Sequence, residues 1–418
     1  MFERWVTRPH DRARLKESAI CRELMVFAAW LESEGYPSRT LRRYLFAAAA
    51  FGRWIARQGL GLADVDESRL QRFFGGRQRH RCRGRRGGRL PDAVFGVGRF
   101  VQAMRVRGLM PAEACSQPPG PIDSILAAFD AHLEHVSGLV LGTRHIYGRY
   151  ARALLETRFG TEVPDFRVLD AERISDFVRA EAERLDTSAR RAPATATRAF
   201  LRFLTGRGLV ADGLVGAVPS VRQWRHASLP SYLSAEDLAA VFACNAAATH
   251  VGRRDRAILM LLARLGLRSC EVSSLRLDDI RWHDGLVLVR LAKSRRERAL
   301  PLPADVGAAV ASYLRDGRPP SRFREVFLAV CAPHKALTPS AVSAVVTSAL
   351  RRAGVSCAHR GAHVLRHTAA THMVRAGATF KEVADVLGHA RIETTAIYAK
   401  LDVDTLAAVA LPWPEATS

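Results

Sequence analysis

The sequence predicts a mainly α protein, in which tandem helical N-terminal domains precede a mixed α/β domain that is mostly helical with a small antiparallel sheet. Apolar residues recur at helical spacing along the first half of the chain. Two segments rich in proline and turn residues divide the chain, and two short runs with strand character lie in its last third. The length of 418 residues, with 48% hydrophobic and 25% charged residues, suits a globular protein of two to four domains.

The two turn-rich segments give the expected domain borders. The first runs from residue 111 to 121 and contains Pro118-Pro119-Gly120-Pro121, and the second runs from 218 to 233. Ser234-Ala-Glu-Asp237 comes directly afterwards and has the pattern of a helix N-terminus. We expect an N-terminal module at 1–118, a second helical domain at 121–222, a third domain at 230–411 and a tail at 412–418.

The first two of these domains resemble each other in sequence. Residues 27–32 (Phe-x-x-Trp-Leu-Glu) match 129–134 (Phe-x-x-His-Leu-Glu), and Arg107-Gly108-Leu109 matches Arg207-Gly208-Leu209. The offsets between matched positions stay close to 100 residues. Two helical segments can align by chance, but the matched aromatic residues and chain ends favour a duplication.

The net charge of +22 and the isoelectric point near 10.8 indicate a polyanionic partner. Nucleic acid is the first candidate and an anionic membrane surface the second. No apolar run approaches the length of a membrane-spanning helix, and the first residues lack the apolar core of a signal peptide. The seven cysteines are scattered, which is typical of reduced thiols in a cytoplasm.

A run of arginine and glycine lies within the first module, at residues 75–89. Seven of its fifteen residues are Arg and five are Gly, so it cannot form a packed element and is expected to be a loop. Such a run is often only a solvated surface, but the charge of the whole chain favours contact with a DNA backbone. The expected contacts are Arg77, Arg79, Arg81, Arg83, Arg85, Arg86 and Arg89.

The third domain combines helical periods with two strands. Residues 286–292 and 298–302 have strand patterns and are joined by a short basic turn at 293–297. Helical patterns resume near residues 304, 338, 362, 380 and 391.

Six residues in this domain form an ordered set suited to phosphodiester chemistry. Fixed cations can hold a phosphodiester while a tyrosine hydroxyl attacks it, and the set lacks the carboxylate cluster of a metal nuclease. Individually each residue has a plainer explanation, such as a surface arginine paired with Glu271 or a tyrosine in a core. The six residues are Arg268, Lys293, His363, Arg366, His389 and Tyr398.

Taken together, these motifs resemble those of the tyrosine recombinase (phage integrase, Xer-like) family. The resemblance covers about residues 230–410, and residues 121–222 resemble the family's helical core-site-binding domain. The first module is extra to the minimal architecture, and Ala362 stands where related sequences often have proline. The matching motifs are Gly266-Leu267-Arg268-Ser-Cys-Glu271, Lys293 followed by Arg298-Ala-Leu-Pro-Leu302, His363-Val-Leu-Arg366-His367, Leu387-Gly388-His389 and Thr394-Thr395-Ala-Ile-Tyr398.

The resemblance implies a reaction and a role for each residue. Tyr398 would attack a DNA phosphate to form a 3′-phosphotyrosine, with His363 as proton acceptor and Lys293 as proton donor to the leaving 5′-oxygen. Arg268 and Arg366 would stabilise the phosphate charge. His389 would hydrogen-bond the phosphate, Glu271 would support Arg268, and Arg295 and Arg296 would contact DNA.

The resemblance also implies partners and a setting. We expect double-stranded DNA with specific recombination sites, a homotetrameric synapse, and related recombinases or accessory proteins, in a bacterial cytoplasm on the nucleoid. No metal, ATP or other cofactor is expected, and the enzyme would serve a mobile element in integration or transposition. A topoisomerase of type IB and a catalytically silent DNA-binding regulator are the alternatives, although the intact six-residue set argues against the regulator.

Overall fold

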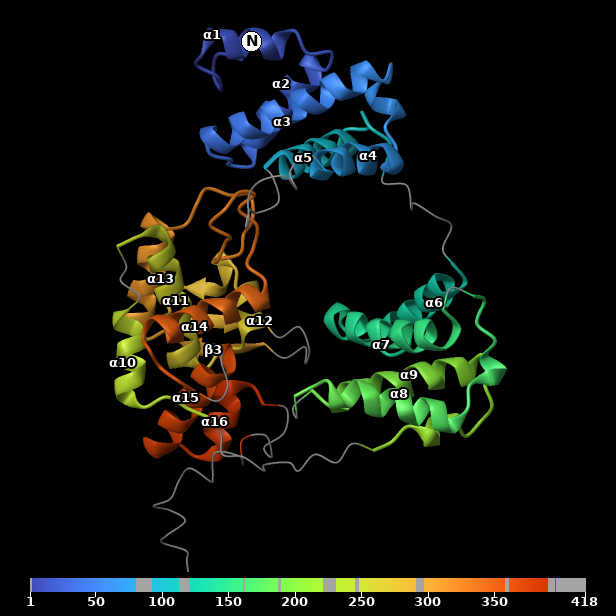
Figure 1. Ribbon diagram of the computed structural model, residues 1–418. Coiled ribbons are helices and arrows are strands. Elements are labelled where there is room, and N and C mark those ends of the chain that lie inside the picture. Colours follow the sequence, from blue (N-terminus) through green and yellow to red (C-terminus); the bar gives the residue numbers. More distant parts are fainter. Residues whose placement is uncertain are drawn as a thin grey trace, which may run out of the picture. The chain divides into compact units, whose positions relative to one another are not determined.

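Helices dominate the computed structural model (Figure 1). It describes residues 2–79, 92–112, 120–160, 162–186, 189–220, 231–244, 248–290, 297–357, 361–389 and 395, with the backbone alone at 76–79 and 92–93. Three short strands form one antiparallel sheet, so the predicted fold class of a mainly helical chain with a small sheet is confirmed. None of the helices in these residues is long and apolar enough to cross a membrane.

The N-terminal helices form a bundle around α3, which packs against both α2 and α5. The apolar period predicted for α2 is buried, and Phe27 meets Phe100 of α5 edge to face with ring centroids 5.3 Å apart. The elements are α1 (Pro9–Lys16), α2 (Cys21–Ser33), α3 (Ser38–Arg57), η1 (Leu62–Asp64), α4 (Glu67–Arg79) and α5 (Asp92–Val106).

A second bundle follows, in which α7 and α9 pack together and α6 and α8 lie against them. Its core also contains a pair of edge-to-face rings, Phe129 of α6 and Phe200 of α9, with centroids 5.0 Å apart. The elements are α6 (Pro121–His135), α7 (Leu141–Phe159), η2 (Phe166–Val168), α8 (Ala171–Glu183), α9 (Arg191–Gly206) and η3 (Leu214–Ala217).

The two bundles share their element order. From α2 in the first and from α6 in the second, two helices are followed by a short 3-10 turn and two further helices, and α1 is extra to the first. One ring of each pair, Phe27 or Phe129, is at a position that the sequence matched. Each bundle ends in the same turn, where Leu109 donates its N–H to Met104 O at 2.9 Å and Leu209 donates to Leu204 O at 3.0 Å. This likeness supports the duplication, which stays a prediction.

The third domain is built around α11, a helix that is buried on nearly all sides. α11 packs against α13, α14 and α15, and its residues from Ala257 to Leu262 all lie in the main core. Ser234 caps α10 by accepting the N–H of Asp237, as its sequence pattern predicted. The helices are α10 (Ala235–Ala243), α11 (His250–Leu265), α12 (Ser269–Ser274), η4 (Leu277–Asp279), α13 (Ala304–Asp316), α14 (Pro339–Arg352), α15 (Ala362–Arg375) and α16 (Phe380–Leu387).

The sheet has the order β1-β2-β3, with all neighbours antiparallel. The two predicted strands are present as β2 (Leu286–Val289) and β3 (Arg298–Pro301), and Val289 pairs with Arg298. β1 (Ile280–Arg281) was not predicted, because two residues are too short for a readable alternation. The helices expected near 304, 338, 362 and 380 are confirmed, whereas the one near 391 lies outside the described residues.

The chain divides into two compact units. The first contains the described parts of Met1–Asp64, Gly76–Met110 and His226–Ser418, and the second contains Val65–Gly75 and the described parts of Pro111–Arg225. The three domain borders expected from the sequence stay a prediction.

Candidate active site

Arg268 lies at the turn between α11 and α12. α11 ends because Gly266 adopts a left-handed conformation (φ 62°), and a Cβ at this position would collide with Leu387. The N–H of Arg268 donates to Oε2 of Glu271 at 2.9 Å, and its side chain turns back so that Nη1 lies 2.9 Å from Oε1. The carboxylate three residues along therefore orients both the backbone and the side chain of Arg268.

Glu271 is buried, with 4% of the residue exposed, and joins two guanidinium groups. Arg298 of β3 donates from Nη1 to Oε1 at 3.1 Å and from Nη2 to Oε2 at 2.9 Å, which is a two-pronged pair. Burial acts to raise the pKa of this carboxyl group, but hydrogen bonds and positive charge from Arg298 and Arg268 outweigh it and lower the pKa. Glu271 is therefore ionised at neutral pH and connects α12 to β3.

Arg366 is buried on α15 and faces the ends of two other helices. Its Nη1 donates to Gly266 O at 2.5 Å and its Nη2 to Leu387 O at 2.7 Å. Nη2 of Arg268 donates to Gly388 O at 3.1 Å. Carbonyl groups at a helix C-terminus carry the negative end of the helix dipole and favour cations. The C-termini of α11 and α16 therefore hold two guanidinium groups close together.

His363 lies on α15, one turn before Arg366, and its side chain reaches solvent. Its ring centroid is 6.2 Å from that of His367, which is half-buried. Loss of hydration on the packed side of the ring, followed by the charges of Arg366 and Arg268, lowers the pKa of His363. The ring is neutral at pH 7 and able to accept a proton.

His389 directly follows the end of α16. That helix ends at Gly388, which adopts a left-handed conformation (φ 62°, ψ 51°). Nδ1 of His389 lies 2.7 Å from Oγ1 of the buried Thr395. Burial, followed by the charges of nearby arginines with Arg366 foremost, lowers the pKa of His389 to about 4. This ring is therefore also neutral at pH 7.

The structure thus gathers four of the six predicted residues, together with Glu271. Arg268 and Arg366 bind carbonyls of neighbouring residues, and both charges act on the pKa of His363 and of His389. Lys293 and Tyr398 lie outside the described residues, as do Arg81, Arg83, Arg85, Arg86, Arg89, Arg295 and Arg296. The expectation of a loop at 75–89 is wrong at its start, because α4 continues to Arg79 and includes Arg77, although the side chains of these two arginines are not described.

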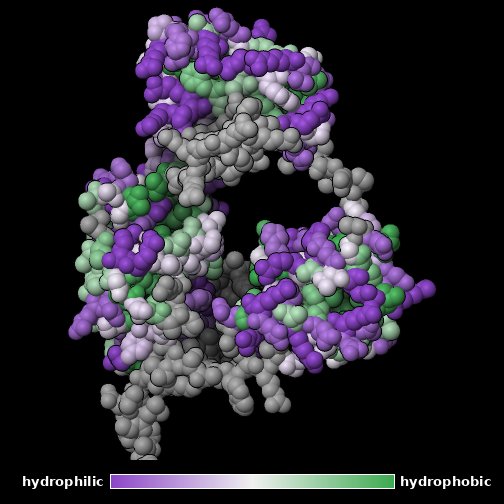
Figure 2. Space-filling view, viewed as in Figure 1, coloured by the Kyte–Doolittle hydropathy of each residue, from purple (hydrophilic) through white to green (hydrophobic). Residues whose placement is uncertain are grey.

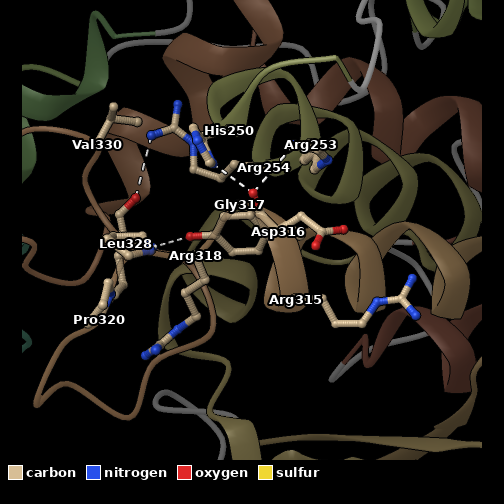
Figure 3. A pocket seen from close by; sticks show the side chains of 12 residues that line it. His250, Arg253, Arg254, Arg315, Asp316, Gly317, Arg318, Pro320, Leu328 and Val330 are labelled. Carbon is tan, nitrogen blue, oxygen red and sulfur yellow. Dashed lines mark hydrogen bonds between the residues drawn. The ribbon is translucent and has the colours of Figure 1, made fainter.

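A separate hollow of about 680 Å³ lies beside α13 in the same domain (Figure 3). Most of its cationic side chains are bound to the protein's own backbone. Nδ1 of His250 lies 2.6 Å from Asp316 O, and Arg254 donates to Leu328 O at 3.4 Å. None of the predicted site residues lines this hollow, so the packing of the domain accounts for it.

Comparison with known proteins identifies the chain. The sequence profile of the phage integrase family matches residues 232–404. Over 404 residues, the chain is 35% identical to the putative integrase/recombinase y4rA of Sinorhizobium fredii (strain NBRC 101917 / NGR234), and the match covers 96% of each chain. The chain belongs to the phage integrase family. It is an enzyme, a site-specific recombinase of the tyrosine class, as the sequence motifs predicted.

Other similar proteins belong to the same group as this tyrosine recombinase. The tyrosine recombinase XerC of Oceanobacillus iheyensis is 32% identical over 215 residues, which cover 50% of this chain and 68% of XerC. The XerH recombinase bound to a palindromic difH substrate has a TM-score of 0.54 and 19% identity, with 85% of this chain and 99% of XerH covered. The Tn1549 transposon integrase bound to a circular intermediate DNA has a TM-score of 0.51 and 15% identity, with 68% of this chain and 99% of the integrase chain covered. These structural matches show a shared fold.

Sequence reasoning about this recombinase missed two residues of the constellation. Arg298 was noted only as the start of a strand, and Thr395 only as part of a motif. A basic residue beside a strand turn and a threonine next to a histidine motif carry no recognisable signal, because their contacts arise from packing between distant segments. Arg298 follows Glu271 by 27 residues, and Thr395 is 0% exposed against His389.

Proposed function

We propose that Tyr398 is the nucleophile of this tyrosine recombinase. Its phenolic oxygen attacks a DNA phosphate, the bond from phosphorus to the 5′-oxygen breaks, and a 3′-phosphotyrosine forms. The phenol proton passes to His363, and Lys293 gives a proton to the departing 5′-oxygen. Free 5′-hydroxyl groups can then attack the phosphotyrosine in the reverse sense, so the strands are rejoined without ATP or a metal.

The convergence of Arg268 and Arg366 is the observation that carries this proposal. Charge develops on the non-bridging oxygens of the phosphate in the transition state, and fixed guanidinium groups are suited to stabilise it. The two hydrogen bonds from the side chain of Arg268 use two of the five donors of a guanidinium, so donors remain for a phosphate.

The neutral histidines suit complementary roles. A neutral His363 can accept the phenol proton, which matters because an ordinary tyrosine has a pKa of about 10 and is largely un-ionised at pH 7. Nδ1 of His389 lies 2.7 Å from Oγ1 of Thr395, and in the tautomer in which this hydroxyl donates to Nδ1 the ring proton is on Nε2. Nε2 can then donate to a phosphate oxygen.

We further propose duplex DNA with specific recombination sites as the substrate and a tetramer as the working assembly. A lambda integrase of 14% identity, with a TM-score of 0.52, forms a tetramer bound to a Holliday junction, which supports this assembly. The names of the relatives also support a role in the integration or transposition of a mobile element. Related recombinases or accessory proteins are proposed as further partners. The enzyme would act in the bacterial cytoplasm, on the nucleoid.

The arginines at 75–89, with Arg295 and Arg296, are proposed as backbone contacts of this DNA. Replacing the seven arginines of 75–89 with glutamine should lower the slope of log affinity against log salt by up to about 6, since each lost phosphate contact removes about 0.9. Replacement with lysine should keep the slope. Equal slopes for the glutamine variant and the unchanged protein would contradict this contact.

Covalent capture tests the proposed chemistry. A nicked duplex carrying the end sequence of the neighbouring genomic element traps the phosphotyrosine, because the short cleaved strand diffuses away. The unchanged protein should become joined to DNA, and Tyr398→Phe should not. Tyr232→Phe, which loses a hydroxyl that accepts from Arg375, is the matched control and should still be captured. Equal capture of the Tyr398 variant would disprove the assignment.

A further inference from the structure

One buried arginine beside the candidate active site takes no part in the proposed reaction. Arginine is seldom buried, and hydrophilic residues lie over much of the visible surface of the protein (Figure 2). The side chain of Arg298, at the start of β3, is only 11% exposed, and its Nε is buried without a hydrogen-bond partner in the described part of the chain. A charge in such a place costs free energy, so the presence of Arg298 here calls for an explanation beyond the filling of space.

The hydrogen bonds of Arg298 fix the plane of the Glu271 carboxylate. Nη1 and Nη2 of Arg298 donate to different carboxylate oxygens, at 3.1 and 2.9 Å. Two parallel bonds prevent a rotation of the carboxylate that a single bond would allow. The same two oxygens accept from Arg268, Oε1 from its side chain and Oε2 from its backbone N–H, both at 2.9 Å. The direction of the Arg268 guanidinium therefore depends on a carboxylate that Arg298 holds in place.

The second support of Arg268 also lies against Arg298. Nη2 of Arg268 donates to Gly388 O at 3.1 Å. A Cβ on Gly388 would collide with Nη1 of Arg298, so the guanidinium of Arg298 packs directly onto the backbone of this glycine. Arg298 is thus in contact with both residues that accept hydrogen bonds from the Arg268 side chain.

A second arginine of the same hairpin provides a comparison. Arg290, which directly follows β2, forms an ion pair with Asp279 at 2.8 Å, and Asp279 is 1% exposed. The other carboxylate oxygen of Asp279 accepts the backbone N–H of Arg276 at 2.9 Å. Both hairpin arginines therefore pair with a buried carboxylate, but of these two carboxylates it is the partner of Arg298 that also binds Arg268.

We infer that Arg298 is a positioning residue of this recombinase, which orients the guanidinium of Arg268 towards the DNA phosphate through Glu271. Stabilisation of a transition state depends on donors that are aimed before the reaction, and a small displacement of such a donor lowers the rate sharply. The planar fork of an arginine can supply this alignment, whereas a lysine ammonium is a point charge without a plane. The inference rests on the proposed function, because Arg268 stabilises the phosphate there.

Arg298→Lys in the full chain tests this inference, with Arg290→Lys as the matched control. Each variant keeps the charge of a hairpin arginine and removes its fork. The rate of covalent capture on the nicked duplex is measured at saturating DNA, well below the thermal midpoint of each variant. Arg298→Lys should lower this rate about 10- to 100-fold. The DNA concentration that gives half-maximal capture should change by less than about 2-fold, because many other phosphate contacts hold the duplex. Arg290→Lys should change both quantities by less than about 2-fold.

A double variant shows whether Arg298 acts through Arg268. In Arg268→Lys there is no guanidinium plane to orient, so the addition of Arg298→Lys should lower the capture rate by less than about 2-fold. A further loss as large as that caused by Arg298→Lys alone would overturn the inference. Equal rates for the unchanged protein and Arg298→Lys would also overturn it, as would equal losses for Arg298→Lys and Arg290→Lys.

NMR of arginine-labelled protein without DNA separates this inference from the proposed chemistry. Hydrogen bonds from both Nη atoms of Arg268 hinder the rotation of its guanidinium. Its Nη signals, assigned with Arg268→Lys, should therefore be resolved in the unchanged protein and in Arg290→Lys, and should average in Arg298→Lys. If the unchanged protein fails to be captured on DNA, the proposed chemistry fails, while these signals still decide whether Arg298 orients Arg268. The same signals in all three proteins would contradict the inference.

Discussion

Glu271 decides how Arg268 is held, because the same carboxylate receives hydrogen bonds from Arg268 and Arg298. Replacing Glu271 with glutamine should destabilise the protein by about 3 kcal/mol at pH 7, since removal of one partner leaves buried guanidinium charge uncompensated. The lowered pKa of Glu271 means that its contribution is present above the unfolded pKa of about 4.3 and is lost as pH falls through the folded value.

Chemical denaturation at pH 7 and at acidic pH measures this effect. The destabilisation caused by Glu271→Gln should shrink as the pH falls below about 4. Glu172→Gln on the exposed start of α8 is the control and should change stability by about 0.5 kcal/mol or less. Similar effects of the two substitutions would contradict the role given to Glu271.

His389 should titrate far below an ordinary histidine, because burial and nearby arginines lower its pKa to about 4. Between that value and the unfolded pKa of about 6.5, the unfolded state binds more protons, so this residue lowers stability as pH falls through the window. NMR of histidine-labelled protein, with His389→Asn for assignment, measures the midpoint. A midpoint at or above 6.5 would show that the ring is not held in this environment.

At the scale of residues, local spacing in the sequence predicted part of the site and missed the rest. Arg268 and Glu271 are three residues apart, so their pairing follows from the helix start alone. The contact of Glu271 with Arg298 depends on how β3 packs beside α12, and that of His389 joins it to Thr395, six residues along the chain. Short-range patterns hold no information on such contacts.

At the scale of elements, the ends of α11 and α16 shape the site as much as its charged residues do. Both helices end at a left-handed glycine, and the carbonyls around these ends accept hydrogen bonds from Arg268 and Arg366. Glycine is typical of such helix ends, so each end taken alone is readable in the sequence. The sequence could not predict that the two ends meet, because that follows from the packing of α15 against α11 and α16.

Gly388→Ala should therefore damage the site through two separate effects. The left-handed backbone costs a residue with a Cβ about 1 to 2 kcal/mol, and the new Cβ would also collide with the guanidinium of Arg298. We expect a total loss near 3 kcal/mol, together with reduced covalent capture. Gly354→Ala is a matched control, since Gly354 has φ 68° and nothing within 4 Å of its Cβ position. Equal losses at the two glycines would show that the collision has no effect.

At the scale of the whole molecule, the sequence predicted the order and the type of the structural parts. Helical period and the turn-rich segments predicted two helical parts before a mixed domain, and charge predicted a polyanion partner. The compact units place Val65–Gly75 with the second bundle, which neither composition nor periodicity indicates. Which helices associate depends on side-chain packing over long distances in sequence.

Two compact units with separate cores should unfold in more than one step. The second unit has its own core around Phe129 and Phe200, and the first has the core around α11. Phe129→Ala should cost about 3 to 5 kcal/mol, because it removes a fully buried ring, and in a unit of roughly 100 residues this lowers the midpoint by more than about 10 °C. Scanning calorimetry of the full chain should show at least one transition whose midpoint falls in the Phe129 variant and one whose midpoint is unchanged.

Val136→Ala, in the same unit but 73% exposed, is the control and should shift neither midpoint. A single transition that shifts as a whole would mean that the units unfold together and would contradict this prediction.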